Sequence, residues 1–128
     1  MSGKVIGIGG IFVKSRDPKA LAAWYAEHLG VTVETWGGVV FSNAPSDPPR
    51  QEQTLWTPFA EDTTYLRPSG REFMINLRVD DLDALVSSLR AKGVALLDRQ
   101  DDSDFGRFRY ILDPEGTLLE LWEPPLAT

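Results

Sequence analysis

Hydrophobic and polar residues alternate in two segments, 10–14 and 73–79, and each segment precedes a stretch with helical periodicity. Alternation with a period of two is typical of a strand that buries one face. Positions spaced 0, +3, +4 and +7 share one face of a helix. They are Leu21, Trp24, Tyr25 and His28 in the first stretch, and Leu82, Leu85, Val86 and Leu89 in the second. The pattern therefore predicts a strand followed by a helix, twice.

The ends of both helices can be predicted from residue types. Asp17 suits the N-cap, Pro18 suits the first helical position, and Gly30 suits the left-handed stop at the C-terminus. Gly93 is the corresponding stop of the second helix. We interpret His28 as a solvated imidazole near the C-terminal end of the first helix, where a positive charge is favourable.

Shorter strands are predicted after each helix. They span residues 32–36, 39–41 and 53–56 in the first half, and 95–98, 107–112 and 117–122 in the second. The Pro-rich stretch 44–50 is interpreted as a loop within the first half. The sequence DPEG at 113–116 has Pro and Gly at the positions that a type I turn favours, so it should join the last two strands as a hairpin.

Three short sequences recur in the same order in both halves. DPKAL at 17–21 returns as DLDAL at 81–85, HLGV at 28–31 as AKGV at 91–94, and TLWTP at 54–58 as ELWEP at 120–124. The spacings of 64, 63 and 66 residues indicate one duplication with small insertions. We therefore predict an α+β fold of tandem βαβββ modules, about 6–58 and 73–124. A polar linker of about 59–72, expected to be mobile, joins them in one domain of residues 1–128, because half the chain is too small for a core.

Composition and charge exclude several classes of function. A net charge of −6 argues against nucleic acid or an anionic membrane surface as partner, because both need clusters of Lys and Arg. No apolar run is long enough to span a bilayer. Cys is absent, which excludes disulfides, thiolate nucleophiles and Cys-metal sites. With no leader-like segment at its start, we expect the protein in the cytoplasm.

The motifs DLDAL at 81–85 and DPEGTLLEL at 113–121 resemble those of the vicinal oxygen chelate superfamily. This superfamily includes glyoxalase I, bleomycin-resistance proteins and extradiol dioxygenases, and the resemblance covers roughly residues 6–124. It implies that the strands of both modules curl into a glyoxalase/bleomycin-resistance/dioxygenase-type curved-sheet cup, with the helices on the outer face. Relatives commonly dimerise, so the resemblance also implies a homodimer.

In metal-dependent members of this superfamily, four inward side chains near the cup floor bind one divalent ion. Carried over by motif position, these sites fall at Gly10, Thr54, Met74 and Glu120. Glu120 alone fits the family pattern, since Gly10 has no ligand atom, Met74 offers only a thioether and Thr54 is a weak neutral ligand. His28 lies on a helix and cannot substitute. We therefore expect neither a metal ion nor another cofactor.

From the same four positions, strand alternation predicts which side chains face the cup. The candidate ligand-binding residues are Phe12, Lys14, Thr54, Trp56, Met74, Asn76, Arg78, Glu120 and Trp122. Aromatic side chains mixed with a few polar groups are typical of a small-molecule pocket. Trp56 and Trp122 occupy equivalent repeat positions and could flank a flat ligand, or simply fill the cup as core. Lys14 and Arg78 indicate that an anionic group would be tolerated.

Several roles stay open for Glu120. It could form a buried ion pair with Arg78 or Lys14, contact a ligand, act as a catalytic acid or base, or have no present chemistry. Three functions follow: a metal-free protein that binds a small aromatic or anionic molecule, an enzyme, or an interaction module with a filled cup. The enzyme would be a metal-dependent lyase, isomerase or dioxygenase, or would use Glu120 alone for proton transfer.

Overall fold

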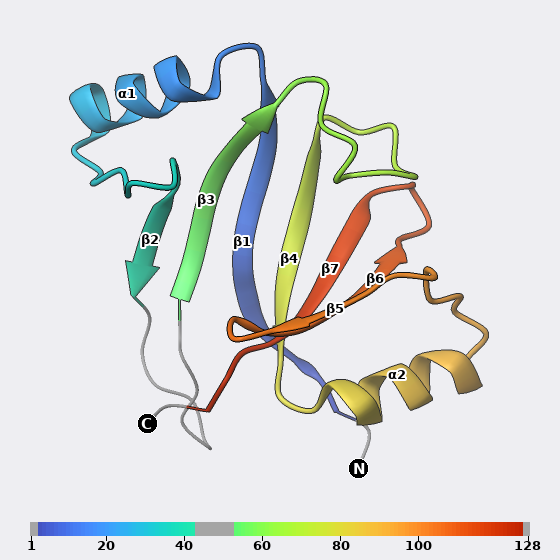
Figure 1. Ribbon diagram of the computed structural model, residues 1–128. Helices are drawn as coiled ribbons and strands as arrows, with labels where there is room; N and C mark the ends of the chain where they lie inside the picture. Colours follow the sequence, from blue (N-terminus) through green and yellow to red (C-terminus); the bar gives the residue numbers. More distant parts are fainter. Residues whose placement is uncertain (1–2, 43–52, 127–128) are drawn as a thin grey trace.

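The computed structural model describes residues 3–42 and 53–126, which form one curved sheet with two helices (Figure 1). The first half contains β1 (Val5–Ser15), α1 (Pro18–Leu29), β2 (Val39–Ser42) and β3 (Gln53–Ala60). The second half contains β4 (Phe73–Val79), α2 (Leu82–Ala91), β5 (Gln100–Ser103), β6 (Gly106–Leu112) and β7 (Leu118–Glu123). The predicted α+β class is confirmed.

The strand order β2-β3-β1-β4-β7-β6-β5 joins the two halves at the centre of the sheet. Strand β1 pairs in parallel with β3, and β4 pairs in parallel with β7, so each half repeats the same arrangement. Strands β1 and β4 pair antiparallel with each other. The first strand of each half is therefore central and brings its inward side chains to the middle of the cup.

The first helix begins directly after its predicted cap, Asp17, and α2 has a cap of the same kind at Asp81. The Asp17 carboxylate accepts a hydrogen bond from the Ala20 backbone N–H at 3.1 Å, and Asp81 does the same for Ala84. Gly30 ends α1 in the left-handed conformation with φ of 72°, which favours glycine. Gly93 follows α2 with φ of 83°. These local signals fix where the chain leaves each strand and turns into its helix.

The predicted buried face of α1 is partly wrong. Ala22 and Tyr25 lie on the side of the helix toward the sheet, where the small Ala22 side chain is buried. Trp24 is exposed and stacks on His28, with 4.6 Å between the ring centroids. Trp24 and His28 shield each other from solvent at the surface, so their helical spacing does not mean that they are buried.

Two of the predicted short strands do not form as predicted. Within 32–36 only Val33 pairs, in an isolated bridge with Val39. Residues 95–98 form no strand, although the Leu97 N–H donates a backbone hydrogen bond to the Tyr110 carbonyl of β6. The strand of this region begins later in the sequence, at residue 100, and is β5. Its sequence, QDDS, is polar and exposed because β5 is an edge strand held by its backbone pairing with β6. Hydrophobic alternation therefore could not reveal it.

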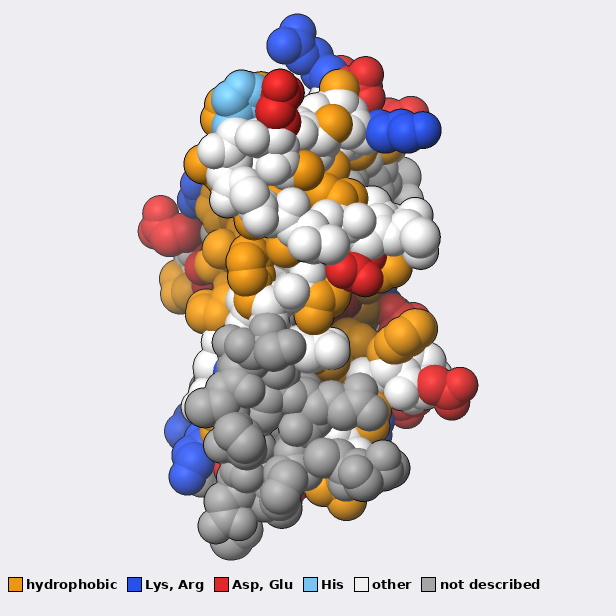
Figure 2. All heavy atoms as spheres, turned by 90° about the vertical axis from the view of Figure 1, so that its left-hand side faces the viewer, with side chains coloured by type: hydrophobic (Ala, Val, Ile, Leu, Met, Phe, Trp, Pro, Cys, Tyr) orange, Lys and Arg blue, Asp and Glu red, His pale blue; other side chains and the backbone are white. Residues whose placement is uncertain are grey.

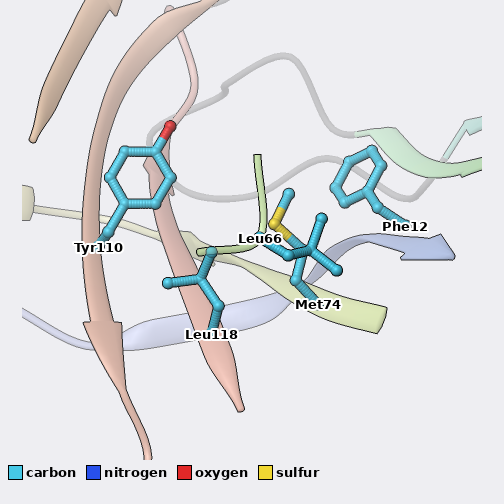
Figure 3. Packing of buried hydrophobic residues seen from close by; sticks show 5 residues of the cluster. All are labelled: Phe12, Leu66, Met74, Tyr110 and Leu118. Carbon is cyan, nitrogen blue, oxygen red and sulfur yellow. The ribbon is translucent and has the colours of Figure 1, made fainter. Parts of the chain in front are cut away.

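Two hydrophobic layers lie on opposite faces of the second-half strands. The outer layer packs α2 against the sheet around Leu82, Val79 and Leu121. The inner layer fills one part of the cup and consists of Phe12, Leu66, Met74, Tyr110 and Leu118. Figure 3 shows Leu66 beside Met74, with Tyr110 and Leu118 on one side and Phe12 on the other. Part of the cup is thus filled by buried hydrophobic side chains.

The segment expected to be a mobile polar linker contributes to this inner layer. Its first part extends β3 to Ala60, and Leu66, in the following turns, is fully buried in the cup. The Arg99 guanidinium donates to the Tyr65 carbonyl at 2.8 Å, which ties the segment to the second half. The segment is therefore part of the packed structure.

Candidate ligand-binding cup

Four residues lie in one row across the central strands. Leu55 pairs with Gly10, Gly10 with Asn76, and Asn76 with Glu120. The prediction had placed Thr54 and Met74 in this row. The structure places Leu55 and Asn76 there instead, so the row contains one carboxylate and one amide beside two residues without ligand atoms.

Thr54 and Trp56 do not face the cup, and their predicted orientation was wrong. Trp56 stacks on Tyr25 of α1, with ring centroids 4.0 Å apart, so it belongs to the helix side of the sheet. A shift of one residue turns every side chain of a strand to the other face. The TLWTP and ELWEP sequences match in type, but their side chains point to opposite faces, because Trp122 lines the cup.

The open part of the cup is a cavity of about 560 Å³. Its lining is mainly aromatic and aliphatic: Phe12, Trp36, Val40, Gln53, Leu55, Phe59, Tyr65, Met74, Asn76, Phe105, Phe108, Glu120 and Trp122. Figure 2 shows hydrophobic side chains gathered on this side of the molecule, between α1 at the top and the residues drawn in grey. Of the predicted ligand-binding residues, Phe12, Met74, Asn76, Glu120 and Trp122 line this cavity.

The two predicted cations, Lys14 and Arg78, are not among the residues that line the cavity. Lys14 lies at the far end of β1, in a surface hollow with Glu61 and Glu72. The Arg78 Nε donates to the Ile8 carbonyl at 3.4 Å. Neither side chain forms the predicted ion pair with Glu120 within the described ranges. The basis for expecting an anionic ligand is therefore removed.

Glu120 is almost completely buried, with 3% of its surface exposed, and the side chains that donate hydrogen bonds to it are neutral. Its Oε2 accepts from the Tyr65 hydroxyl at 2.5 Å and from the Tyr110 hydroxyl at 2.8 Å. Its Oε1 accepts from Asn76 Nδ2 at 2.7 Å. Hydrogen bonds to an ionised acceptor are roughly twice as strong as neutral ones, so these three donors hold the carboxylate firmly in one orientation.

Both tyrosines that contact Glu120 keep their protons far into the alkaline range. Burial, followed by the charge of Glu120, raises the pKa of Tyr65 and of Tyr110 above its usual value. Tyr110 also lies 2.7 Å from Asp101 Oδ2, so its single proton faces two carboxylates. The phenols therefore act as fixed hydrogen-bond donors.

Two aromatic pairs stand on either side of the polar row. Phe12 and Phe59, from β1 and β3, stack with 5.3 Å between centroids. Phe108 and Trp122, from β6 and β7, are parallel to within 2° at 6.0 Å. The Trp122 indole N–H donates to the Phe105 carbonyl at 2.7 Å, which ties the β5–β6 turn to the cup wall.

Sequence reasoning missed several of these residues. Phe108 alternates with Tyr110 on a strand that was predicted, so extending the alternation would have found both. Phe59 lies four residues after Leu55 on the same strand, so both side chains are on the same face of β3. Tyr65 had no usable signal, because it lies in a turn without periodicity.

The residues present do not fit the metal site of the metal-dependent relatives. Leu55 and Gly10 in the row have no ligand atom, and both oxygens of Glu120 already accept hydrogen bonds. Nowhere in residues 3–42 and 53–126 do three His, Cys, Asp or Glu side chains gather as a cation site would require. No step of the chemistry proposed below therefore uses a metal.

Comparisons with known proteins agree with this fold. A family model described as a glyoxalase-like domain matches residues 10–122. Methylmalonyl-CoA epimerase from Streptomyces coelicolor, in complex with 2-nitronate-propionyl-CoA, is 21% identical with a TM-score of 0.70, over 94% of this chain and 99% of that one. The epimerase from Mycobacterium tuberculosis is 23% identical with a TM-score of 0.62, over 97% and 91%.

A glyoxalase/bleomycin resistance protein/dioxygenase superfamily member from Vibrio splendidus 12B01 is 13% identical with a TM-score of 0.56, over 94% of this chain and 98% of that one. A search of curated proteins found no match. Neither helix of the described chain is long and apolar enough to cross a membrane.

Proposed function

Because the chain belongs to the glyoxalase-like domain family, we propose that it binds a small, largely apolar aromatic molecule in its cup without a metal ion. The observation that carries this proposal is the cavity of about 560 Å³ with a predominantly aromatic lining. Small-molecule sites are typically concave, mostly apolar and of 300–1,000 Å³, with a few fixed polar groups. Glu120, Asn76 and Tyr65 supply those polar groups here.

The two aromatic pairs suggest how the molecule would be held. Phe12 and Phe59 come from the first half, and Phe108 and Trp122 from the second, so a flat ligand can contact both walls at once. Aromatic pairs contribute about 0.5–1.5 kcal/mol each beyond the area they bury. Trp36 and Phe105 are largely exposed and line the same cavity, so both are accessible to an entering molecule.

The coenzyme A derivative that the S. coelicolor epimerase binds does not suit the cavity of this chain. That complex contains 2-nitronate-propionyl-CoA, which carries several negative charges. Within the described ranges, no Lys or Arg lines the cavity, and its one charged side chain is a carboxylate. An anionic ligand would therefore face repulsion.

Two half-exposed tryptophans provide a matched test. Trp36 lines the cavity and is 53% exposed, whereas Trp24 lies on α1 away from it and is 50% exposed. With 2-naphthylmethanol as a neutral probe, Trp36→Ala should weaken binding about 3- to 10-fold, as the loss of one stacking contact requires. Trp24→Ala should leave the Kd unchanged, and chelator or added Mn²⁺ should not alter it. Equal effects of the two variants, or absence of saturable binding by calorimetry, would refute the proposal.

A second candidate function is proton transfer by Glu120. The favouring observation is that a buried carboxylate lines a cavity while two phenols donate to its Oε2. A bound molecule with an acidic C–H bond would then exchange that proton through Glu120. Mass spectrometry of such a molecule after incubation with protein in D₂O would show the exchange. Deuterium uptake that persists in Glu120→Gln would exclude this role.

We also propose that the protein is a homodimer. Val5, Ile8 and Ile11 on the central strand β1 are each 44% exposed, although a central strand is normally covered on both faces. Contiguous exposed apolar residues often mark protein interfaces. Light scattering should give twice the 14.2 kDa monomer mass, and Ile11→Glu should reduce it. A monomer mass for the unmodified protein would contradict the proposal.

A further inference from the structure

We propose that the cup selects organic cations, taking an aromatic molecule whose protonated amine pairs with Glu120. This inference rests on the proposed function and adds the class of ligand. Within the described ranges, Glu120 is the one charged side chain that lines the cavity. Among the described residues, a single negative group therefore sets the charge of the cup.

Among residues 3–42 and 53–126, Glu120 has no positively charged hydrogen-bond or ion-pair partner. Its three hydrogen-bond donors, Tyr65, Tyr110 and Asn76, are all neutral. A buried charge without a counter-ion is costly, and a ligand of opposite charge offsets that cost. A cation entering the cup supplies the missing counter-ion, whereas an anion adds a second uncompensated charge.

Arg99, a cation close to this cluster, is already held by other groups. The Arg99 guanidinium carbon lies 4.2 Å and 4.0 Å from the ring centroids of Tyr65 and Tyr110, so it stacks against the tyrosines. Its Nε also lies 3.6 Å from Asp101. Arg99 is therefore neutralised at the outer side of the tyrosines and does not line the cavity.

Glu120 keeps acceptor capacity for a ligand. A carboxylate has about four lone-pair sites. Oε2 lies within hydrogen-bond distance of both phenol hydroxyls, while Oε1 accepts one proton, from Asn76. One site on Oε1 is thus left for a ligand N–H, which favours a protonated amine over a quaternary ammonium that has no N–H.

The aromatic lining also favours a cation. The negative faces of aromatic rings attract a positive group that lies within about 6 Å of the ring centroid. Trp122 and Tyr65 both line the cavity, as do Phe12, Phe59 and Phe108. The rings can therefore stabilise an ammonium group as it passes toward Glu120 and hold the apolar body behind it.

Three probes with the same ring system test the sign of the preference: 2-naphthylmethylammonium, 2-naphthylmethanol and 2-naphthoate. Calorimetry at pH 7 should give the tightest Kd for the ammonium, at least tenfold below that of the alcohol, and the weakest for the carboxylate. Equal or tighter binding of the naphthoate would overturn the inference while leaving an aromatic-binding cup intact. Failure of all three probes to bind would overturn the proposed function and the inference with it.

A matched pair of variants assigns the preference to Glu120. Glu120→Gln should reduce the advantage of the ammonium over the alcohol from at least tenfold to less than threefold. Asp104→Asn removes an equal charge from an exposed residue beside Phe105 and should leave the advantage unchanged. An advantage that survives in Glu120→Gln, or disappears in Asp104→Asn, would show that Glu120 does not select the cation. The unmodified protein still tests the sign if Glu120→Gln does not fold.

Discussion

Leu66 offers the most direct test of how the cup is built, since it lies in the segment between the halves and is fully buried. It packs among Phe12, Met74, Tyr110 and Leu118 (Figure 3). Leu66→Ala removes three carbons, worth about 2.4 kcal/mol at about 0.8 kcal/mol per buried methylene. A residual cavity adds about 24 cal/mol per Å³, and measured Leu→Ala costs in well-packed cores are about 2.7–5.0 kcal/mol.

We therefore expect Leu66→Ala to lower the free energy of unfolding by about 3–5 kcal/mol. Urea denaturation followed by far-UV circular dichroism measures this value from the shift of the midpoint at constant m-value. Leu29→Ala is the matched control, because Leu29 is 59% exposed at the end of α1 and should change stability by less than about 0.5 kcal/mol. A loss below about 1 kcal/mol for Leu66→Ala would refute the inner layer as described.

Three further predictions concern local features. Gly9→Ala should lower the free energy of unfolding, measured by urea denaturation, by about 1–3 kcal/mol, because a Cβ there would overlap the buried Asn76 amide. Gly70→Ala is the control, since the space around Gly70 is open, and it should lower this free energy far less. Equal effects of the two variants would contradict the close packing at Gly9. Asp17→Ala should cost about 1 kcal/mol by the same measurement through loss of the N-cap bond, and no change would show that the cap is not formed in solution. The raised pKa values of Tyr65 and Tyr110 mean that the contribution of these two groups to stability is complete below about pH 10 and is lost above it, because the unfolded chain loses the phenol protons first. Absorbance at 295 nm should show both ionising only as the protein unfolds, and ionisation in the folded protein near pH 10 would refute the shift.

Most of the fold could be predicted because its signals are local. Asp17 and Gly30 marked the ends of α1, and the alternation at 73–79 gave β4 its observed bounds. Among the elements that were not predicted is β5, whose polar residues 100–103 form an exposed edge strand through backbone bonds alone. Backbone pairing of this kind leaves no trace in the pattern of hydrophobic residues.

The candidate site was only partly predictable because register is a property of the sheet. The recurring LWxP sequences suggested that Trp56 and Trp122 are equivalent, but pairing of Gly10 with Leu55 turns Trp56 toward α1. Glu120 was identified correctly as a cup residue, whereas its contact with Tyr65 was not. The two residues are 55 positions apart, and Tyr65 lies in a turn, where no periodic pattern of residues indicates the direction of a side chain.

The close packing around Gly10 also bears on how this cup could evolve. A Cβ at Gly10 would lie 2.9 Å from the Leu55 carbonyl oxygen and 3.0 Å from the Phe12 ring, so no larger residue fits while both neighbours stay in place. A single mutation to a ligating side chain at this position would first damage the fold. A metal site of the kind that metal-dependent relatives have would then require coordinated changes at several positions, and selection acting one step at a time would rarely find them.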